Sequence, residues 1–460
     1  MRTKTSRRDF LKQTSLAGVG FWVAGGLVLA DSKSPNEKIN IACIGVGGKG
    51  DSDTDQAGNH GNIVALCDID DHHLEAKASK FPHAKKYNDF RKMLEEMDKQ
   101  IDAVTVSTPD HTHAPASIMA MKMGKHVYCQ KPLTHDVYEA RMMKEIAAKH
   151  KVATQMGNQG TAENGLRQAV EIIQAGGIGP VSEAHVWTNR PIWPQAPGVV
   201  ARPDDTPPVP KHVHWDLFLG PAPERPYAVY PPNKKGEIKP AYHPFAWRGW
   251  WDFGTGALGD MACHTANMPF MALKLQYPTS VSAESGPVNP ETYPGWATAT
   301  WEFPARGDMP PVKLVWYEGH RDDVRNLPAP ELLKGQMASD SGALLVGTKG
   351  TLFTPNDYGA DFRLLPSENF EGYKGPAPTL PRNGGGDDGM KREWVAAIKG
   401  GPPAMSNFDY ASLLAETVLL GNVAIRLGKK LEWDGPGLKV TNCPEAAQYI
   451  RREYRKGWTL

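Results

Sequence analysis

The sequence has little cysteine and almost no net charge. Its 460 residues include five cysteines, and no C-x-x-C or Cys/His spacing typical of a zinc site is present, so we predict no metal. With 52 basic and 51 acidic residues the formal net charge is +1, which argues against nucleic acid or an anionic membrane surface as a partner. The expected partner is a small molecule.

The few cysteines also argue against a disulfide framework. Cys43, Cys67 and Cys129 each lie in or beside a short apolar run that is typical of a buried strand, so we expect them to be buried free thiols. Cys263 and Cys443 could pair in an oxidising compartment, and the sequence leaves that pairing open.

The N-terminal apolar stretch is too short for a comfortable membrane span. Leu16–Ala30 is rich in glycine and falls below the ~20 apolar residues that a spanning helix needs. It follows a pair of arginines, Arg7 and Arg8, which predicts a twin-arginine export signal over residues 1–30, cleaved after Ala30. We therefore expect a periplasmic or secreted protein with no stable membrane insertion.

The most informative motif is a glycine-rich turn after the first apolar run. Ile39–Ile44 leads into Gly45-Val46-Gly47-Gly48-Lys49-Gly50, and a second apolar run ends at Asp68. This order of strand, glycines, helix, strand and acid is a dinucleotide-binding fingerprint, in which the acid binds the adenosine ribose. Asp68 would repel a 2′-phosphate, and no arginine stands among the five residues that follow it. The predicted cofactor is therefore NAD rather than NADP.

Beyond the glycine turn, short apolar runs alternate with helical stretches as far as residue 156, which predicts βαβ units and a doubly wound parallel sheet over residues 37–156. Residues 157–460 are expected to form an α+β domain with a large open, mostly antiparallel sheet. Residues 190–259 are rich in Pro, Gly and aromatics, too aromatic for disorder, and are interpreted as ordered loops that wall a pocket. Two helices, 390–399 and 410–427, are expected to close the chain.

Two constellations carry candidate chemistry. Lys131, in Gln130-Lys131-Pro132, follows an apolar run, and ligands of parallel sheets bind beyond the carboxyl ends of the strands. Asp260 and His264 stand four residues apart, on one face of an expected helix. His264 can take the proton of an alcohol as hydride leaves, Lys131 can stabilise alkoxide charge, and Asp260 can orient the substrate or the imidazole. For each residue taken alone, a structural role is the simpler alternative.

These motifs resemble the Gfo/Idh/MocA oxidoreductases over essentially all of the chain after the leader. The family has the glycine loop, a strand end here read as Ser107-Thr-Pro109-Asp-His111-Thr-His113, an E-K-P tripeptide and a later D-x-x-x-H. The resemblance implies that Lys131, Asp260 and His264 are catalytic. The chain departs from the family at Gln130, where glutamic acid is usual, and so lacks a negative charge that would favour a protonated lysine.

The predicted cofactor-binding residues, taken from the fingerprint and the resemblance, are Gly45, Val46, Gly47, Gly48, Lys49, Gly50, Asp68, Thr108, Pro109, His111, His113, Gln130, Lys131 and Asn158. His113 is alternatively a core residue at the start of a helix. A cluster of tryptophans beside two arginines suits a sugar, because aromatic faces stack on the C–H surface of a pyranose. The predicted substrate residues are Gln159, Arg190, Trp193, Arg248, Trp250 and Trp251.

The sequence therefore predicts an exported oxidoreductase that retains NAD and oxidises a ring hydroxyl of a sugar or glycoside, with C3 as one candidate carbon. One alternative is an NAD-dependent glycoside hydrolase that works by oxidation, elimination, hydration and reduction. Another is a non-catalytic sugar-binding protein with structural NAD. The resemblance implies a homodimer or homotetramer, with the second sheet as the interface.

Overall fold

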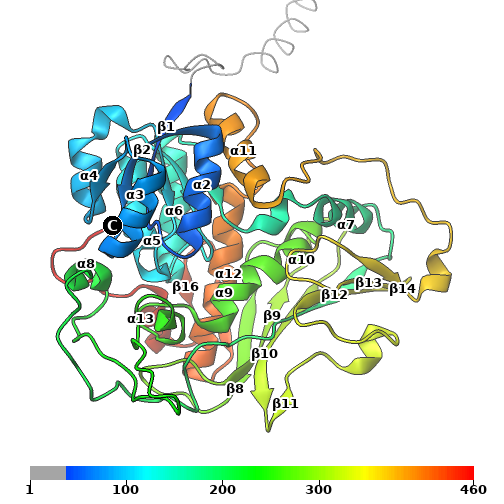
Figure 1. Ribbon diagram of the computed structural model, residues 1–460. Coiled ribbons are helices and arrows are strands. Elements are labelled where there is room, and N and C mark those ends of the chain that lie inside the picture. The colour runs from blue at the N-terminus through cyan, green and yellow to red at the C-terminus, as the bar shows by residue number, and fades with distance from the viewer. Residues whose placement is uncertain (1–37) are drawn as a thin grey trace, which may run out of the picture.

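The computed structural model describes residues 38–460 (Figure 1). The predicted export signal lies outside the described residues. Two sheets organise the chain, one in the N-terminal third and one in the remainder. Both expected classes of sheet are present, and the fold prediction is confirmed.

The first sheet is parallel and has six strands in the order β3-β2-β1-β4-β5-β6. These strands are β1 (Ile39–Ile44), β2 (Gly61–Cys67), β3 (Lys85–Tyr87), β4 (Ala103–Val106), β5 (His126–Cys129) and β6 (Thr154–Met156). The connecting helices are α2 (Lys49–His60), α3 (Asp71–Lys80), α4 (Phe90–Glu96), α5 (His113–Lys122) and α6 (Val137–His150). The strand order reverses between β1 and β4, which is where a doubly wound sheet binds its ligand.

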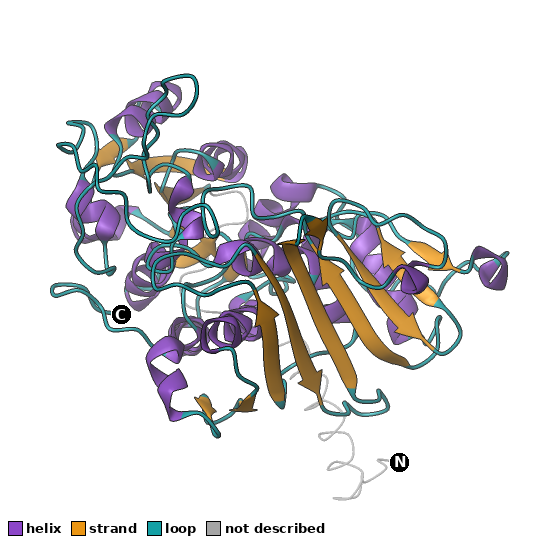
Figure 2. Ribbon diagram, turned by 90° about the horizontal axis from the view of Figure 1, so that it is seen from below, coloured by secondary structure: helices purple, strands orange, loops and turns teal. Residues whose placement is uncertain are grey.

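The second sheet has its main strands in the order β14-β13-β12-β7-β10-β9-β8-β15-β16, with β11 beside β10. Its strands are β7 (Val181–Trp187), β8 (Ser280–Ser285), β9 (Trp296–Phe303), β10 (Val312–Arg321), β11 (Val324–Arg325), β12 (Gly342–Gly347), β13 (Thr351–Thr354), β14 (Arg363–Leu365), β15 (Leu431–Asp434) and β16 (Lys439–Val440). Strands β7 and β10 pair in parallel, and the other described pairs are antiparallel. Figure 2 shows this sheet from below, with its strands in front of the helices.

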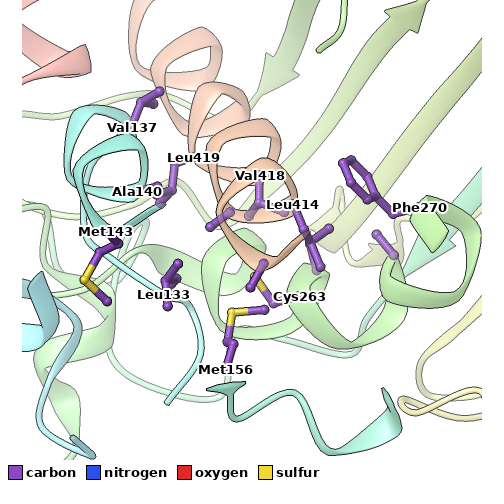
Figure 3. Close-up of a cluster of buried hydrophobic side chains, with 14 of the residues drawn as sticks. Leu133, Val137, Ala140, Met143, Met156, Cys263, Phe270, Leu414, Val418 and Leu419 are labelled. Atoms are coloured by element: carbon purple, nitrogen blue, oxygen red, sulfur yellow. The ribbon is translucent and has the colours of Figure 1, made fainter. Parts of the chain in front are cut away.

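Helices cover one face of the second sheet: α9 (Gly256–Thr265) and α12 (Phe408–Leu427) both contact its strands, and α10 (Asn267–Ala272) packs against α7 (Asn164–Gln174) and α9. Helix α12 also packs on α6, and Figure 3 shows Leu419 of α12 beside Ala140 of α6. By length and composition α12 could cross a membrane, but 83% of its apolar window is buried, so it acts as the shared core helix.

The C-terminal part differs from the sequence prediction in two ways. Strands β15 and β16 and a short helix α13 (Ala447–Ile450) follow α12, so the two predicted helices do not end the chain. These strands were missed because each is four residues or fewer and gains its stability from pairing at the sheet edge. Cys263 and Cys443 are free, buried thiols, so the possible disulfide does not form in this structure.

One buried acid in the second sheet gives a testable pH dependence. The Glu318 side chain on β10 accepts a hydrogen bond of 2.7 Å from Trp316 Nε1, and burial raises its pKa from 4.5 to about 8. A carboxyl that is held neutral stabilises the fold below its unfolded pKa, and that contribution is lost as pH rises towards 8. Between pH 6 and 9, the melting temperature of Glu318→Gln should fall less than that of wild type. An identical slope for the two proteins would contradict this.

Candidate active site

A cavity of about 620 Å³ opens at the carboxyl ends of the parallel strands. The glycine turn after β1 forms one end, and α9 of the second domain forms the other. Residues 217–248, within the loop region predicted to wall a pocket, supply a third side that includes Phe245, Trp247 and Arg248. The cavity therefore joins the predicted nucleotide-binding turn to the predicted catalytic helix.

The glycine turn has the geometry that a dinucleotide requires. Gly45 has φ +78°, and a Cβ there would lie 2.7 Å from Ser107 O; a Cβ on Gly50 would lie 2.0 Å from Gly45 O. Val46 N and Gly47 N donate to Asp68 Oδ2 over 2.8 and 3.2 Å. Gly45, Gly47, Gly48, Lys49 and Asp68 line the cavity, whereas Val46 and Gly50 form the turn behind it.

Histidines gather at the Asp68 end of the cavity. His243 Nε2 lies 2.8 Å from Asp70 Oδ2, and His73 Nδ1 lies 3.8 Å from Asp68 Oδ1. Hydrogen bonding to Asp68 raises the pKa of His73 against the opposing effect of burial. Asp70 also stands close to His72 and His212, so two groups of potential metal ligands share this carboxylate. Both His73 and His243 face the space expected for the adenosine half of NAD.

Lys131 lies at the opposite end, where β5 ends. Its Nζ donates to the main-chain oxygen of Asp260 over 2.6 Å and to Asp260 Oδ1 over 2.9 Å. The Lys131–Pro132 peptide bond is cis. Burial raises the pKa of Asp260, but Lys131 and Arg248 outweigh burial and bring that pKa down to about 2. Asp260 is therefore a carboxylate at neutral pH, held between two cations.

His264 lies one helical turn after Asp260 on α9, and both side chains line the cavity. Burial, and after it the charge of Lys131, lowers the pKa of His264 to about 3. The imidazole is thus neutral, the form that can accept a proton. Its ring packs edge-on against Tyr358, with the ring centroids 5.0 Å apart.

Three buried polar atoms of the cavity residues have no hydrogen-bond partner within the described part of the chain: Thr108 Oγ1, Gln159 Oε1 and His264 Nδ1. Buried polar groups are normally paired, so unpaired ones beside a cavity indicate a missing ligand. Together with the glycine turn and Asp68, they show that the residues present fit a nicotinamide dinucleotide. Pro109, Gln130 and Arg190 also line the cavity.

Several predicted cofactor residues lie behind the cavity wall instead. His111 is fully buried, with its two ring nitrogens 3.2 and 2.7 Å from the main-chain oxygens of Phe253 and Phe218. His113 bridges the main-chain oxygens of Pro132 and Thr108, each over 2.8 Å. Asn158 donates to Cys263 O and accepts from Ser406. His113 thus supports the segments that carry Thr108 and Lys131, whereas His111 and Asn158 tie their own loops to residues of the second half of the chain. None of the three side chains lines the cavity.

The tryptophan prediction needs a similar correction. Trp193, Trp250 and Trp251 are 6, 0 and 4% exposed and do not line the cavity. Each indole N–H donates to a neighbouring loop, to Gln195, Ala241 and Asn289 respectively, because a buried indole needs both apolar packing and an acceptor. Trp247 is the tryptophan that lines the cavity, with the Arg248 guanidinium 4.3 Å from its ring centroid.

The structure adds cavity residues that the sequence did not single out as site residues. Burial raises the pKa of Asp110 to about 7, although Thr255 Oγ1 donates to it over 2.6 Å. Asp110 follows Pro109 in the strand-end motif, so its position could have indicated a role. Asp357 and Tyr358 reach the cavity from the loop after β13, and no local pattern marks them.

Comparisons with known proteins agree with this geometry. The sequence model of the oxidoreductase family with an NAD-binding Rossmann fold matches residues 39–158, and the model of its C-terminal alpha/beta domain matches residues 199–305. A glycosyl hydrolase family 109 protein of Solibacter usitatus is 35% identical over 154 residues, 30% of this chain and 35% of its own. An inositol 2-dehydrogenase of Salmonella typhimurium is 30% identical over 125 residues, 27% of this chain and 37% of its own. The chain thus spans about a third of the length of these curated relatives.

Solved structures share the fold across both domains. The WlbA dehydrogenase of Bordetella pertussis, in complex with NADH and UDP-GlcNAcA, matches with a TM-score of 0.58 and 15% identity, covering 86% of this chain and 99% of its own. Aldose-aldose oxidoreductase of Caulobacter crescentus matches with a TM-score of 0.56 and 16% identity, covering 86% and 100%. Residues 39–158 thus match the NAD-binding Rossmann model of the Gfo/Idh/MocA oxidoreductases, and residues 199–305 match the C-terminal model of the same family.

Proposed function

We propose that this protein oxidises a ring hydroxyl of a sugar or glycoside, with C3 as the first carbon to test. The observation that carries the proposal is the convergence of Lys131, Asp260 and His264 on one cavity that also contains the glycine turn. Bound NAD would supply the hydride acceptor, held by the glycine turn, Asp68 and Thr108.

Lys131, Asp260 and His264 each have a different role in this reaction. His264, neutral because of its lowered pKa, takes the hydroxyl proton. Lys131 Nζ can donate to the substrate oxygen and stabilise negative charge that develops there. Asp260, ionised between Lys131 and Arg248, keeps the lysine aimed into the cavity.

The substrate end suits a polyhydroxylated ring. Trp247 and Phe245 offer apolar surface, while Arg190, Arg248 and Gln159 offer hydrogen-bonding groups on the same cavity. Stacking of a sugar's C–H face on an aromatic ring, with polar groups around its edge, is a common way to bind carbohydrate. We expect binding of a monosaccharide or of one sugar unit of a glycoside.

Export and cofactor retention belong to the same proposal. A protein exported through the predicted twin-arginine signal would act where NAD is not replenished, so the cofactor would be bound tightly and recycled in place. The loop region that includes His243, Phe245 and Trp247 walls the cavity beside the nucleotide turn, which supports slow release. A homodimer or homotetramer formed through the open face of the second sheet is the corresponding proposal for assembly.

A net glycoside hydrolase is the second candidate, favoured by the similarity to the glycosyl hydrolase family 109 protein. Oxidation at C3 acidifies the C2 hydrogen, elimination expels the C1 substituent, water adds, and the hydride returns to C3. The reaction begins with the same oxidation, so the same three residues serve both candidates.

The test uses the purified protein without added cofactor. A panel of sugars is followed by absorbance at 340 nm, and aryl glycosides are followed by release of the aryl alcohol. Reduction of bound NAD by a sugar supports the oxidoreductase, and catalytic aryl release supports the hydrolase. Failure of every sugar and glycoside to do either, with NAD present in the protein, would contradict the proposal and favour a binding protein.

A further inference from the structure

The glutamine at position 130 stands next to a buried carboxylate. Gln130 Nε2 donates over 2.8 Å to Oδ2 of Asp53, a residue of α2 that is fully buried. Gln130 Oε1 lies 3.3 Å from the main-chain nitrogen of Lys131. The side chain thus connects Asp53 to the residue that carries the catalytic amine.

The glycine at position 157 leaves the space that this contact needs. A Cβ on Gly157 would lie 2.6 Å from Gln130 Nε2, so a larger residue there would push the glutamine away from Asp53. Ser107 Oγ, on the loop after β4, donates to the same Asp53 oxygen over 2.8 Å. Two neutral donors from the floor of the cavity therefore converge on one carboxylate oxygen.

The other oxygen of Asp53 has two cationic partners: Lys49 Nζ of the glycine turn, 3.2 Å away, and a lysine from a distant part of the chain. Lys391 Nζ lies 2.5 Å from Asp53 Oδ1 and is itself fully buried. Lys391 belongs to α11 (Gly386–Ile398), which packs beside α2 (Figure 1). Its Nζ also donates to Gln56 over 2.9 Å and to Asp387 over 3.1 Å, so the ammonium has a full set of acceptors.

A glutamate at position 130 would not be accommodated in this setting. Its carboxylate would lie at hydrogen-bond distance from that of Asp53, and two buried carboxylates at that distance repel strongly. Glutamine turns the repulsion into a hydrogen bond. The negative charge that the family places at this position is present, but it lies on Asp53, one hydrogen bond further from Lys131.

We propose that Asp53, with Lys391 and Lys49 as its counter-ions, is the positioning residue for Lys131, and that it supplies the negative charge that a glutamate at position 130 would have supplied. Gln130 links Asp53 to Lys131, because its side chain contacts both the Asp53 carboxylate and the main-chain nitrogen at the start of the Lys131–Pro132 segment. The inference rests on the proposed catalytic role of Lys131. It also gives α11 a role, because this helix places Lys391 of the C-terminal region against Asp53.

The test is a charge-exchange cycle with three variants: Gln130→Glu, Asp53→Asn, and the double variant. Each single change alters the buried charge by one. The double variant restores that charge, because the new amide at position 53 can donate to the new carboxylate at position 130. The matched control is Asp51→Asn, a change of the same kind at an exposed position in the first turn of α2. Asp51 pairs with Lys77, and Lys77 keeps a second carboxylate, that of Asp55, at 2.8 Å. Melting temperature and the pH dependence of Lys131 acetylation by acetic anhydride, followed by peptide mass spectrometry, are measured for every protein.

We expect each single variant to melt at least about 5 °C lower than wild type. Asp53→Asn removes the shorter of the two ion pairs of the buried Lys391, and Gln130→Glu places a second carboxylate against that of Asp53. The double variant should recover most of that loss. The pH at which half of Lys131 is acetylated should fall by about half a unit in Asp53→Asn and rise by a similar amount in Gln130→Glu. It should return to the wild-type value in the double variant, and the control should match wild type.

Two results would overturn the inference. If the double variant is no more stable than the less stable single variant, a carboxylate at position 130 does not replace the carboxylate at position 53. If stability is restored but the acetylation profile of Lys131 is the same in all proteins, Asp53 is a structural residue without influence on the lysine. Neither measurement uses a sugar, so failure of the proposed reaction would leave them intact.

Discussion

Replacement of Lys131 by methionine is expected to lower sugar-dependent turnover by at least about 1,000-fold while the fold and the NAD content stay intact. Methionine preserves the apolar stem but removes the cation that donates to Asp260 and, in the proposed reaction, would donate to the substrate oxygen. Asp260 keeps Arg248 Nε at 3.4 Å, so its carboxylate is not left without a cation. Initial rates, melting temperature and released NAD are measured together.

The matched control for this variant is Lys122→Met, which removes an exposed lysine at the end of α5. It should leave turnover within about twofold of wild type, as expected for a surface change. Turnover of Lys131→Met at the wild-type rate would exclude the catalytic role. A variant that has lost NAD or melts far below wild type would instead assign the lysine to binding or folding, contrary to our account.

Replacement of His264 by glutamine is the second change with a large expected effect. Glutamine retains hydrogen bonding but cannot take the hydroxyl proton, so kcat should fall by about 100- to 10,000-fold with little change in KM. Because the pKa of His264 is lowered to about 3, wild-type kcat/KM should show no loss near pH 6.5 from protonation of this residue.

His264→Gln is also expected to change how the stability of the protein depends on pH. A histidine whose pKa falls from 6.5 to about 3 on folding favours the unfolded state as pH drops below 6.5, since that state binds the proton. His264→Gln should therefore lose less melting temperature than wild type between pH 7 and 4. An unchanged kcat, or a KM effect alone, would show that His264 is not the base.

Local order in the sequence was enough to predict the nucleotide turn and to single out Lys131, Asp260 and His264, which line one cavity with it. The glycine turn lies between two strands and ends in close packing that excludes any Cβ at Gly50, so its residue types follow from the backbone alone. The spacing of Asp260 and His264 fixes them on one helical face. Lys131 follows a parallel strand, and the carboxyl ends of such strands form the ligand edge.

The remaining parts of the site depend on long-range packing. Trp250 and Trp247 are three residues apart in the same loop, yet one is fully buried and the other lines the cavity. Tyr358, in the loop between β13 and β14, packs against His264, and Lys391 on α11 pairs with Asp53. Both residues are distant in sequence from these partners, so no periodicity indicates the contacts. His111 and His113 stand in a motif that indicates a cofactor site, but their ring nitrogens meet main-chain oxygens within the protein.

The most direct test of the account is the cofactor content of the protein as purified. The protein is denatured, and the released NAD(H) is quantified by mass spectrometry against the protein concentration, with no cofactor added at any stage. We expect close to one NAD(H) per chain, with no NADP, because Asp68 closes the second strand and the cavity is walled by the loop region. An empty site, or NADP in place of NAD, would contradict a self-contained NAD-dependent sugar oxidoreductase.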